Sequence, residues 1–203
     1  NRAITNLLYF FGLKKTFVIY SPQRSFSNFF RQLMELNIYI NYEQGKKNNN
    51  YYKHNPKVKI DTNIRKKFII FILYKEFDLW YESLKKNPMD FFKVSKDYGY
   101  QFNSYKEKTK LKKYHYNFYS FWIQNQKKIS NIEFIDYRDF LHAENIYKFI
   151  GYIKNKYKLL TKKNIKIPVK IRFSKKLNKK KILKNLKKKD SLSRLISRAA
   201  LFK

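Results

Sequence analysis

The amino-acid sequence predicts a mainly α-helical protein, in which a mixed, mostly helical and aromatic-rich N-terminal extension precedes a small basic helical C-terminal domain. Hydrophobic residues make up 43% of the 203 positions, which is enough for a packed core. Apolar residues recur at helical spacing near the start of the chain and again near its end. In the middle of the chain the same spacing relates Phe77, Trp80, Tyr81 and Leu84.

The first 57 residues are expected to contain one clear helix. Ser21-Pro22 is a turn signal. Ser27 is a suitable helix cap, and one helical face after it carries Phe29, Phe30, Leu33 and Met34. Residues 43–57 are polar and rich in turn formers, so we expect that segment to be an exposed loop.

Residues 58–87 hold the most apolar part of the chain, and two structures compete for them. The β-branched beginning suits a strand, whereas the spacing from Phe77 to Leu84 suits a helix. We predict a helix here, ended by Asn87-Pro88 because the residue before a proline disfavours the helical conformation.

Residues 91–128 interleave aromatic and basic side chains, and this pattern has two interpretations. Aromatic rings between lysines can stack on unpaired bases, as on many surfaces that bind single-stranded RNA. Alternatively, the Tyr and Phe residues fill the core. The core interpretation is favoured, because no strand motif typical of RNA-recognition domains accompanies the rings.

The last fifty residues, 154–203, carry 20 basic residues and a single acid, Asp190. Ser174 is a suitable N-cap for a helix whose apolar stripe is Leu177, Ile182, Leu183 and Leu186. A second short helix is expected after Asp190, with Leu192, Leu195, Ile196 and Ala199 on one face. The stripe is narrower than that of a membrane-surface helix, so phosphate contact is favoured over membrane contact and over a disordered tail.

The charge of the whole chain points to a polyanionic partner. There are 47 basic residues against 14 acidic ones, a formal net charge of +33. Self-repulsion of this size destabilises a compact state, and RNA in a permanent assembly would relieve it. Lys, Asn, Ile, Phe and Tyr fill 117 positions, which indicates an A/T-rich genome such as that of a protist organelle. Codon bias explains part of the lysine excess but not the shortage of acids.

The sequence also argues against several kinds of site. It contains no cysteine, which excludes disulfides and Cys-based metal centres. The longest apolar run, residues 68–74, is too short to span a bilayer. Asp139, His142 and Glu144 form the only local cluster of metal-ligand types, without the usual spacing. No catalytic or phosphate-loop motif is present, so we expect no enzyme activity, no metal or other cofactor and no small-molecule substrate.

Several short motifs follow one another in the last third of the chain. "IDYRD" occupies residues 135–139 and "IYKFI" residues 146–150. "KLLTKK" (158–163) or "KIPVKI" (166–171) comes next, and "FSKKLNKKKILKNLKKKDSLSRL" fills 173–195. In this order they resemble the opening, first helix, basic loop and basic second helix of the bacterial-type small-subunit ribosomal protein eighteen family.

The sequence departs from the pattern of that family in three places. The first helix carries an insertion, Leu177-Asn178 replaces a glutamine pair, and Lys189-Asp190 replaces an Ala-Arg end. The resemblance implies a small helical domain bound to ribosomal RNA and to neighbouring small-subunit proteins. Residues 131–203 would be this domain, and residues 1–130 an organelle-type extension that contacts rRNA and protein.

We therefore expect a structural protein of the mitochondrial small ribosomal subunit, located in the matrix, for which the organelle genome is one possible source. The basic, amphipathic first 15 residues are read as a buried N-terminal element in preference to a targeting remnant. Alternatives are a basic subunit of a membrane complex and a degenerate nucleic-acid-processing protein. The residues expected to contact rRNA phosphates are Lys162, Lys163, Lys170, Arg172, Lys175, Lys176, Lys179, Lys180, Lys184, Lys187, Lys188, Arg194 and Arg198.

Overall fold

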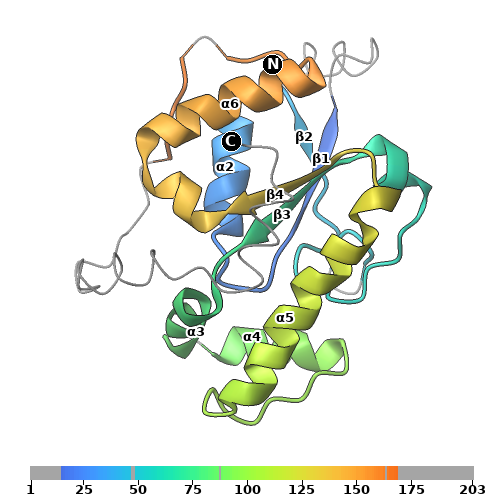
Figure 1. Cartoon of the computed structure of the whole chain (residues 1–203), viewed down its shortest axis with the longest axis vertical. Helices are drawn as coiled ribbons and strands as arrows, with labels where there is room; N and C mark the ends of the chain where they lie inside the picture. Colours follow the sequence, from blue (N-terminus) through green and yellow to red (C-terminus); the bar gives the residue numbers. More distant parts are fainter. Residues whose placement is uncertain (1–14, 47–48, 87, 163, 169–203) are drawn as a thin grey trace.

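A parallel β-sheet lies at the centre of the molecule and corrects the predicted fold class. The computed structural model describes residues 15–46, 49–86, 88–162 and 164–168. These form a three-layer α/β fold, not a mainly α protein, with helices on both faces of the sheet (Figure 1). The four strands are all parallel in the order β2-β1-β3-β4: β1 (Thr16–Tyr20), β2 (Asn41–Tyr42), β3 (Ile69–Tyr74) and β4 (Ile132–Asp136).

The error in the predicted class comes mainly from β3, the central strand. All six of its residues are buried. A strand that is covered on both faces reads as a continuous apolar run without alternation, so periodicity cannot distinguish it from a buried helix. The predicted helix across residues 58–87 is therefore wrong for β3. It is confirmed for the later part of that segment, where α3 (Phe77–Lys85) ends before Pro88.

Helices α2 (Ser27–Asn37) and α6 (Ala143–Tyr157) cover one face of the sheet. The opposite face is covered by α3, α4 (Met89–Asp97) and α5 (Lys108–Asn125). Three short helical turns connect these elements: the π-helical η1 (Asn63–Lys67) and the 3-10 turns η2 (Gln126–Lys128) and η3 (Tyr137–Leu141).

The predicted first helix and the loop after it are confirmed, with one difference each. Ser27 is the first residue of α2 and not its cap, a position that Phe26 occupies. Residues 43–57 form no regular element in their described part. They are not wholly exposed, because His54 and Asn55 are buried.

Two apolar cores pack against the two faces of the sheet, and alternate strand residues divide between them. Val18, Ile70 and Ile72 face α3, α4 and α5, whereas Phe17, Ile19 and Phe71 face α2 and α6. Most rings of residues 91–128 lie in the first core or pack against it. Five are buried there, Phe91, Tyr114, Phe118, Tyr119 and Trp122, and four partly buried rings pack against them, Phe92, Tyr100, Phe102 and Phe121. The core interpretation of these aromatic residues is confirmed.

The segment that resembles the ribosomal family takes part in this sheet. "IDYRD" spans the end of β4 and the start of η3, and β4 pairs with β3 over five residues. The strand at Ile132–Asp136 therefore differs from the wholly helical domain that the resemblance implies, whereas the helical η3 and α6 follow it. The boundary expected at residues 130–131 falls between α5 and β4, inside one sheet. The helices predicted beyond Ser174 lie outside the described residues.

In the part of the chain that the structure describes, no helix is long and apolar enough to cross a membrane.

Candidate nucleic-acid interface

Five exposed basic residues lie together where the central strands begin, and we call them the basic edge. Three come from η1 and two from η2, namely Arg65, Lys66, Lys67, Lys127 and Lys128. The η1 turn precedes β3 and the η2 turn precedes β4. Because parallel strands begin at the same edge of a sheet, this topology brings the two basic segments side by side.

Hydrogen bonds fasten the two segments to each other. Ser130 donates from its backbone N–H and its hydroxyl to the carbonyl oxygen of Arg65, at 3.3 and 2.9 Å. The side-chain amide of Asn131 donates to the carbonyl oxygen of Lys66 at 3.3 Å. Figure 1 shows η1 beside the end of α5, which leads into η2. The backbone under the basic edge is thus held by the sheet itself.

The η1 turn is supported from below by polar and aromatic contacts. The Asp61 carboxylate accepts hydrogen bonds from the Ile64 N–H at 2.8 Å and the Tyr51 hydroxyl at 2.9 Å. Tyr51 packs edge-on against Phe68 with ring centroids 5.1 Å apart. Burial raises the pKa of Asp61, but the hydrogen bonds outweigh it and lower that pKa on balance. The carboxylate is charged and serves the fold of the turn.

The Asp61 carboxylate under η1 accepts hydrogen bonds from neutral donors and forms no ion pair with the basic edge among the described residues. None of the five side chains of the basic edge forms an ion pair with a described carboxylate. The opposite edge, where the strands end, carries acids and cations together: Asp136 pairs with Arg138, and Lys75 is next to Glu76 in the chain. The basic edge, whose cations lack such partners among the described residues, attracts a polyanion.

Part of this charge also stabilises the fold. The last carbonyl groups of a helix carry partial negative charge and favour nearby cations. Lys127 and Lys128 directly follow α5, so they interact favourably with its C-terminus. Arg65, Lys66 and Lys67 lie in the last turn of η1, whose five residues give a much smaller dipole than the 18 residues of α5.

Lys162 is the only predicted phosphate contact that lies within the described ranges. Its ammonium donates to the carbonyl oxygen of Glu35 at 2.6 Å and lies 5.6 Å from the ring centroid of Tyr39. It therefore binds the C-terminal turn of α2, and its phosphate contact stays a prediction. The other predicted residues, which run from Lys163 to Arg198, lie outside the described residues.

The sequence contains a local signal for the basic edge. "IRKK" and "QKK" each stand shortly before an apolar run. The two segments come together only because β3 pairs in parallel with β4, and a helix over residues 58–87 would not form that pairing.

Asp139, His142 and Glu144 do not gather into a metal site. Within the described segments, no group of three or more His, Asp or Glu side chains is arranged to hold a metal ion. His142 is exposed, and Glu144 instead pairs with Lys148 at 2.6 Å.

Comparisons with models of known protein families, with curated proteins and with solved structures found no match.

Proposed function

We propose that this protein binds ribosomal RNA through phosphate contacts, as a non-enzymatic structural component of a mitochondrial small ribosomal subunit. The basic edge is the observation that carries the proposal. Five exposed cations on segments joined by hydrogen bonds, without ion-pair partners among the described residues, suit a phosphate backbone. The net charge of +33 supports a partner that is present permanently.

The A/T-rich composition supports an organelle, and the matrix is where a mitochondrial ribosome would hold the protein. Membership of the ribosomal protein eighteen family stays a prediction. The strand at Ile132–Asp136 differs from the helical fold that this family implies. RNA binding rests on the charge and on the basic edge, which do not require that family.

The basic edge can be tested in the full chain with the variant Arg65→Gln, Lys66→Gln, Lys67→Gln. Each lost phosphate contact should reduce the slope of log affinity against log salt by about 0.7 to 0.9. We expect a slope smaller by about 2 to 3 and correspondingly weaker binding to the small-subunit rRNA at low salt. Fluorescence anisotropy over a range of KCl concentrations measures both quantities.

A matched control removes the same charge elsewhere. Lys93, Lys96 and Lys112 are exposed on α4 and α5, away from the basic edge, and a triple Gln variant of them has the same net charge. This control should retain most of the wild-type slope. Equal losses in the two variants would show that only total charge matters and would reject the basic edge as an interface.

The ribosomal assignment needs a separate measurement. In a native organelle extract, the protein should sediment with the small subunit at low salt and leave that fraction after RNase treatment. Sedimentation as a free monomer under both conditions would contradict it.

A further inference from the structure

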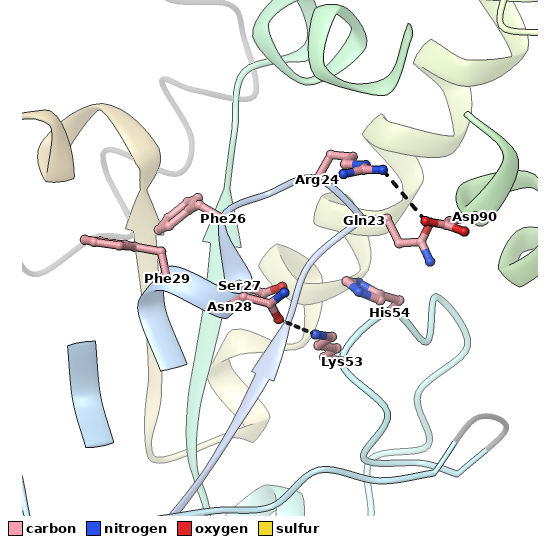
Figure 2. Close-up of a pocket in the computed structure, with 9 residues that line it drawn as sticks. All are labelled: Gln23, Arg24, Phe26, Ser27, Asn28, Phe29, Lys53, His54 and Asp90. Carbon is pink, nitrogen blue, oxygen red and sulfur yellow. Dashed lines mark hydrogen bonds and ion pairs between the residues drawn. The ribbon is translucent and has the colours of Figure 1, made fainter. Parts of the chain in front are cut away.

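A pocket of about 290 Å³ opens on the other side of the molecule, at the edge where the strands end. The chain leaves β1 toward β2 on one side and returns to β3 on the other. In open α/β sheets this reversal of strand order marks the usual position of a ligand site. The pocket is lined by Gln23, Arg24, Phe26, Ser27, Asn28, Phe29, Lys53, His54 and Asp90 (Figure 2).

The loop between β1 and α2 turns its carbonyl groups toward buried donors of the protein. The carbonyl oxygen of Ser21 accepts from His54 Nδ1 at 2.8 Å, and that of Gln23 accepts from the Trp80 indole at 2.6 Å. The carbonyl oxygen of Arg24 accepts from the ammonium of Lys75 at 3.3 Å. These acceptors are therefore used within the fold, which leaves donors to line the pocket.

The donors that face the pocket come from two segments, the start of α2 and the loop that carries Lys53 and His54. Figure 2 shows Ser27 and Asn28, at the start of α2, turned toward Lys53 and His54. The first N–H groups of a helix have no partner within it, and its dipole favours an anion there. Lys53 adds an ammonium, whose hydrogen bond to the Asn28 side-chain oxygen measures 2.8 Å. The first turn of α2 and the loop that carries Lys53 therefore fix the positions of these donors.

Polar groups at this pocket lack partners among the described residues. Ser27 is 7% exposed, lines the pocket and forms no hydrogen bond through its hydroxyl to a described residue. The buried Oε1 atom of Gln23, which also lines the pocket, has no partner among the described residues, but as an acceptor it would pair with a donor on a ligand and not with a phosphate oxygen. The Ser27 hydroxyl is therefore a donor that faces the pocket and is available to a polar ligand.

The charge of the lining selects an anion over a cation. Arg24 and Lys53 are its two cations, and Asp90 is its one carboxylate. Asp90 already lies 3.8 Å from Arg24 and is largely exposed. Burial, with a smaller effect from Arg31, lowers the pKa of Lys53, as expected for an ammonium without a nearby counterion.

We propose that this pocket binds a phosphate group, held by the Lys53 ammonium, the Ser27 hydroxyl and the first N–H groups of α2. The volume suits one phosphate with its attached sugar and is too small for a dinucleotide. The site is separate from the basic edge, so it does not depend on the proposed RNA contacts there.

The test is a backbone-amide NMR titration of the full chain with inorganic phosphate and with a nucleoside 5′-monophosphate, at constant ionic strength. The N–H signals of Ser27, Asn28 and Phe29 should shift in a saturable manner. Lys53→Gln and Ser27→Ala should each weaken binding by roughly tenfold or more, because each removes a direct donor.

The control is Lys112→Gln, which removes the same charge from the exposed surface of α5. It should leave the titration unchanged, and the unperturbed signals of β3 report that each variant is folded. Linear, non-saturating shifts in the wild type would overturn the proposal. So would equal affinities in the wild type and in Ser27→Ala, the milder of the two substitutions.

A measurement of RNA affinity for the Lys53→Gln variant then distinguishes a phosphate of an RNA backbone from that of a free ligand. If the group belongs to an RNA backbone, Lys53→Gln should reduce the salt slope of RNA binding by about 0.7 to 0.9. If it belongs to a free phosphorylated ligand, the slope should be unchanged while the response to the monophosphate is lost. Either result supports a phosphate site, and neither changes the outcome of the test on the basic edge.

Discussion

Two of the three histidines are built into the core as neutral rings. His115 is 2% exposed among aromatic side chains, and its Nε2 lies 2.8 Å from the carbonyl oxygen of Lys75. His54 is 7% exposed and bonds to the carbonyl oxygen of Ser21. A carbonyl oxygen only accepts hydrogen bonds, so each of these ring nitrogens carries a proton. Burial lowers the pKa of His54 to about 3 and that of His115 to about 4.

These values predict a loss of stability in mild acid. Between pH 6.5 and pH 4 the unfolded chain binds protons at both histidines while the folded chain does not, so stability is complete above pH 6.5 and falls below it. Each histidine should cost about 2 kcal/mol of unfolding free energy between pH 7 and pH 5. Urea denaturation at the two pH values measures the difference.

The variant His115→Gln should remove about half of this pH dependence, whereas His142→Gln should leave it as in the wild type because His142 is exposed. A wild-type pH dependence retained in His115→Gln would show that His115 is not responsible.

Glu133 shows how a buried charge is tolerated on β4. It is 3% exposed and accepts hydrogen bonds from the Tyr157 hydroxyl at 2.5 Å and the Lys156 ammonium at 2.6 Å. Burial by itself would lower the pKa of Lys156, but its contacts with Glu133 and Tyr152 raise it on balance. The cluster ties α6 to the edge strand, because an unpaired carboxylate in this position would be costly.

At the scale of elements, phenylalanine rings join α2 and α6 to the central strand. The ring centroid of Phe71 on β3 lies 4.9 Å from Phe30 on α2 and 6.2 Å from Phe149 on α6. Phe30 and Phe149 also contact each other at 5.6 Å. All three rings are fully buried, so this cluster holds the helical layer on one face of the sheet.

Truncation of the central ring tests this packing. Phe71→Ala should lower the unfolding free energy by about 3 to 5 kcal/mol, because it removes buried apolar area and leaves a cavity between both helices. Tyr116→Ala, at a half-exposed ring on α5, should change it by less than about 0.5 kcal/mol. Chemical denaturation measures both, and a small effect of Phe71→Ala would contradict the role of the cluster.

Sequence periodicity predicted the elements that have one apolar face, but it did not predict the strands that are buried on both faces. Helix α2 presents Phe30, Leu33 and Met34 to the core and polar residues to solvent. Its apolar residues therefore recur in the sequence with the helical period of 3.6 residues. Strand β3 is covered by helices on both faces and shows no period. The basic edge was missed for the same reason, since without β3 and β4 nothing brings η1 and η2 together.

At the scale of the whole molecule, positive charge dominates behaviour in solution. Like charges of this number repel across the compact chain and destabilise it. Salt shortens the range of that repulsion, from roughly 14 Å at 50 mM to roughly 4 Å at 500 mM ionic strength. A polyanion opposes the same repulsion by binding.

The melting temperature should therefore rise when NaCl is increased from 50 to 500 mM. A gain of about 2 kcal/mol corresponds to roughly 4–8 °C for a chain of this size. Heparin at 50 mM NaCl should produce a similar rise, which uncharged dextran of the same mass should not. A melting temperature that responds to neither salt nor heparin would show that the charge is compensated within the fold.

The amino-acid sequence by itself determined the net charge, the absence of cysteine chemistry and the supply of aromatic residues for a core, because these depend on composition alone. Tertiary structure decided that residues 69–74 are a strand and that distant lysines share one edge. Such features arise from pairing between segments far apart in the chain, as between β1 and β3, and local periodicity carries no information about them.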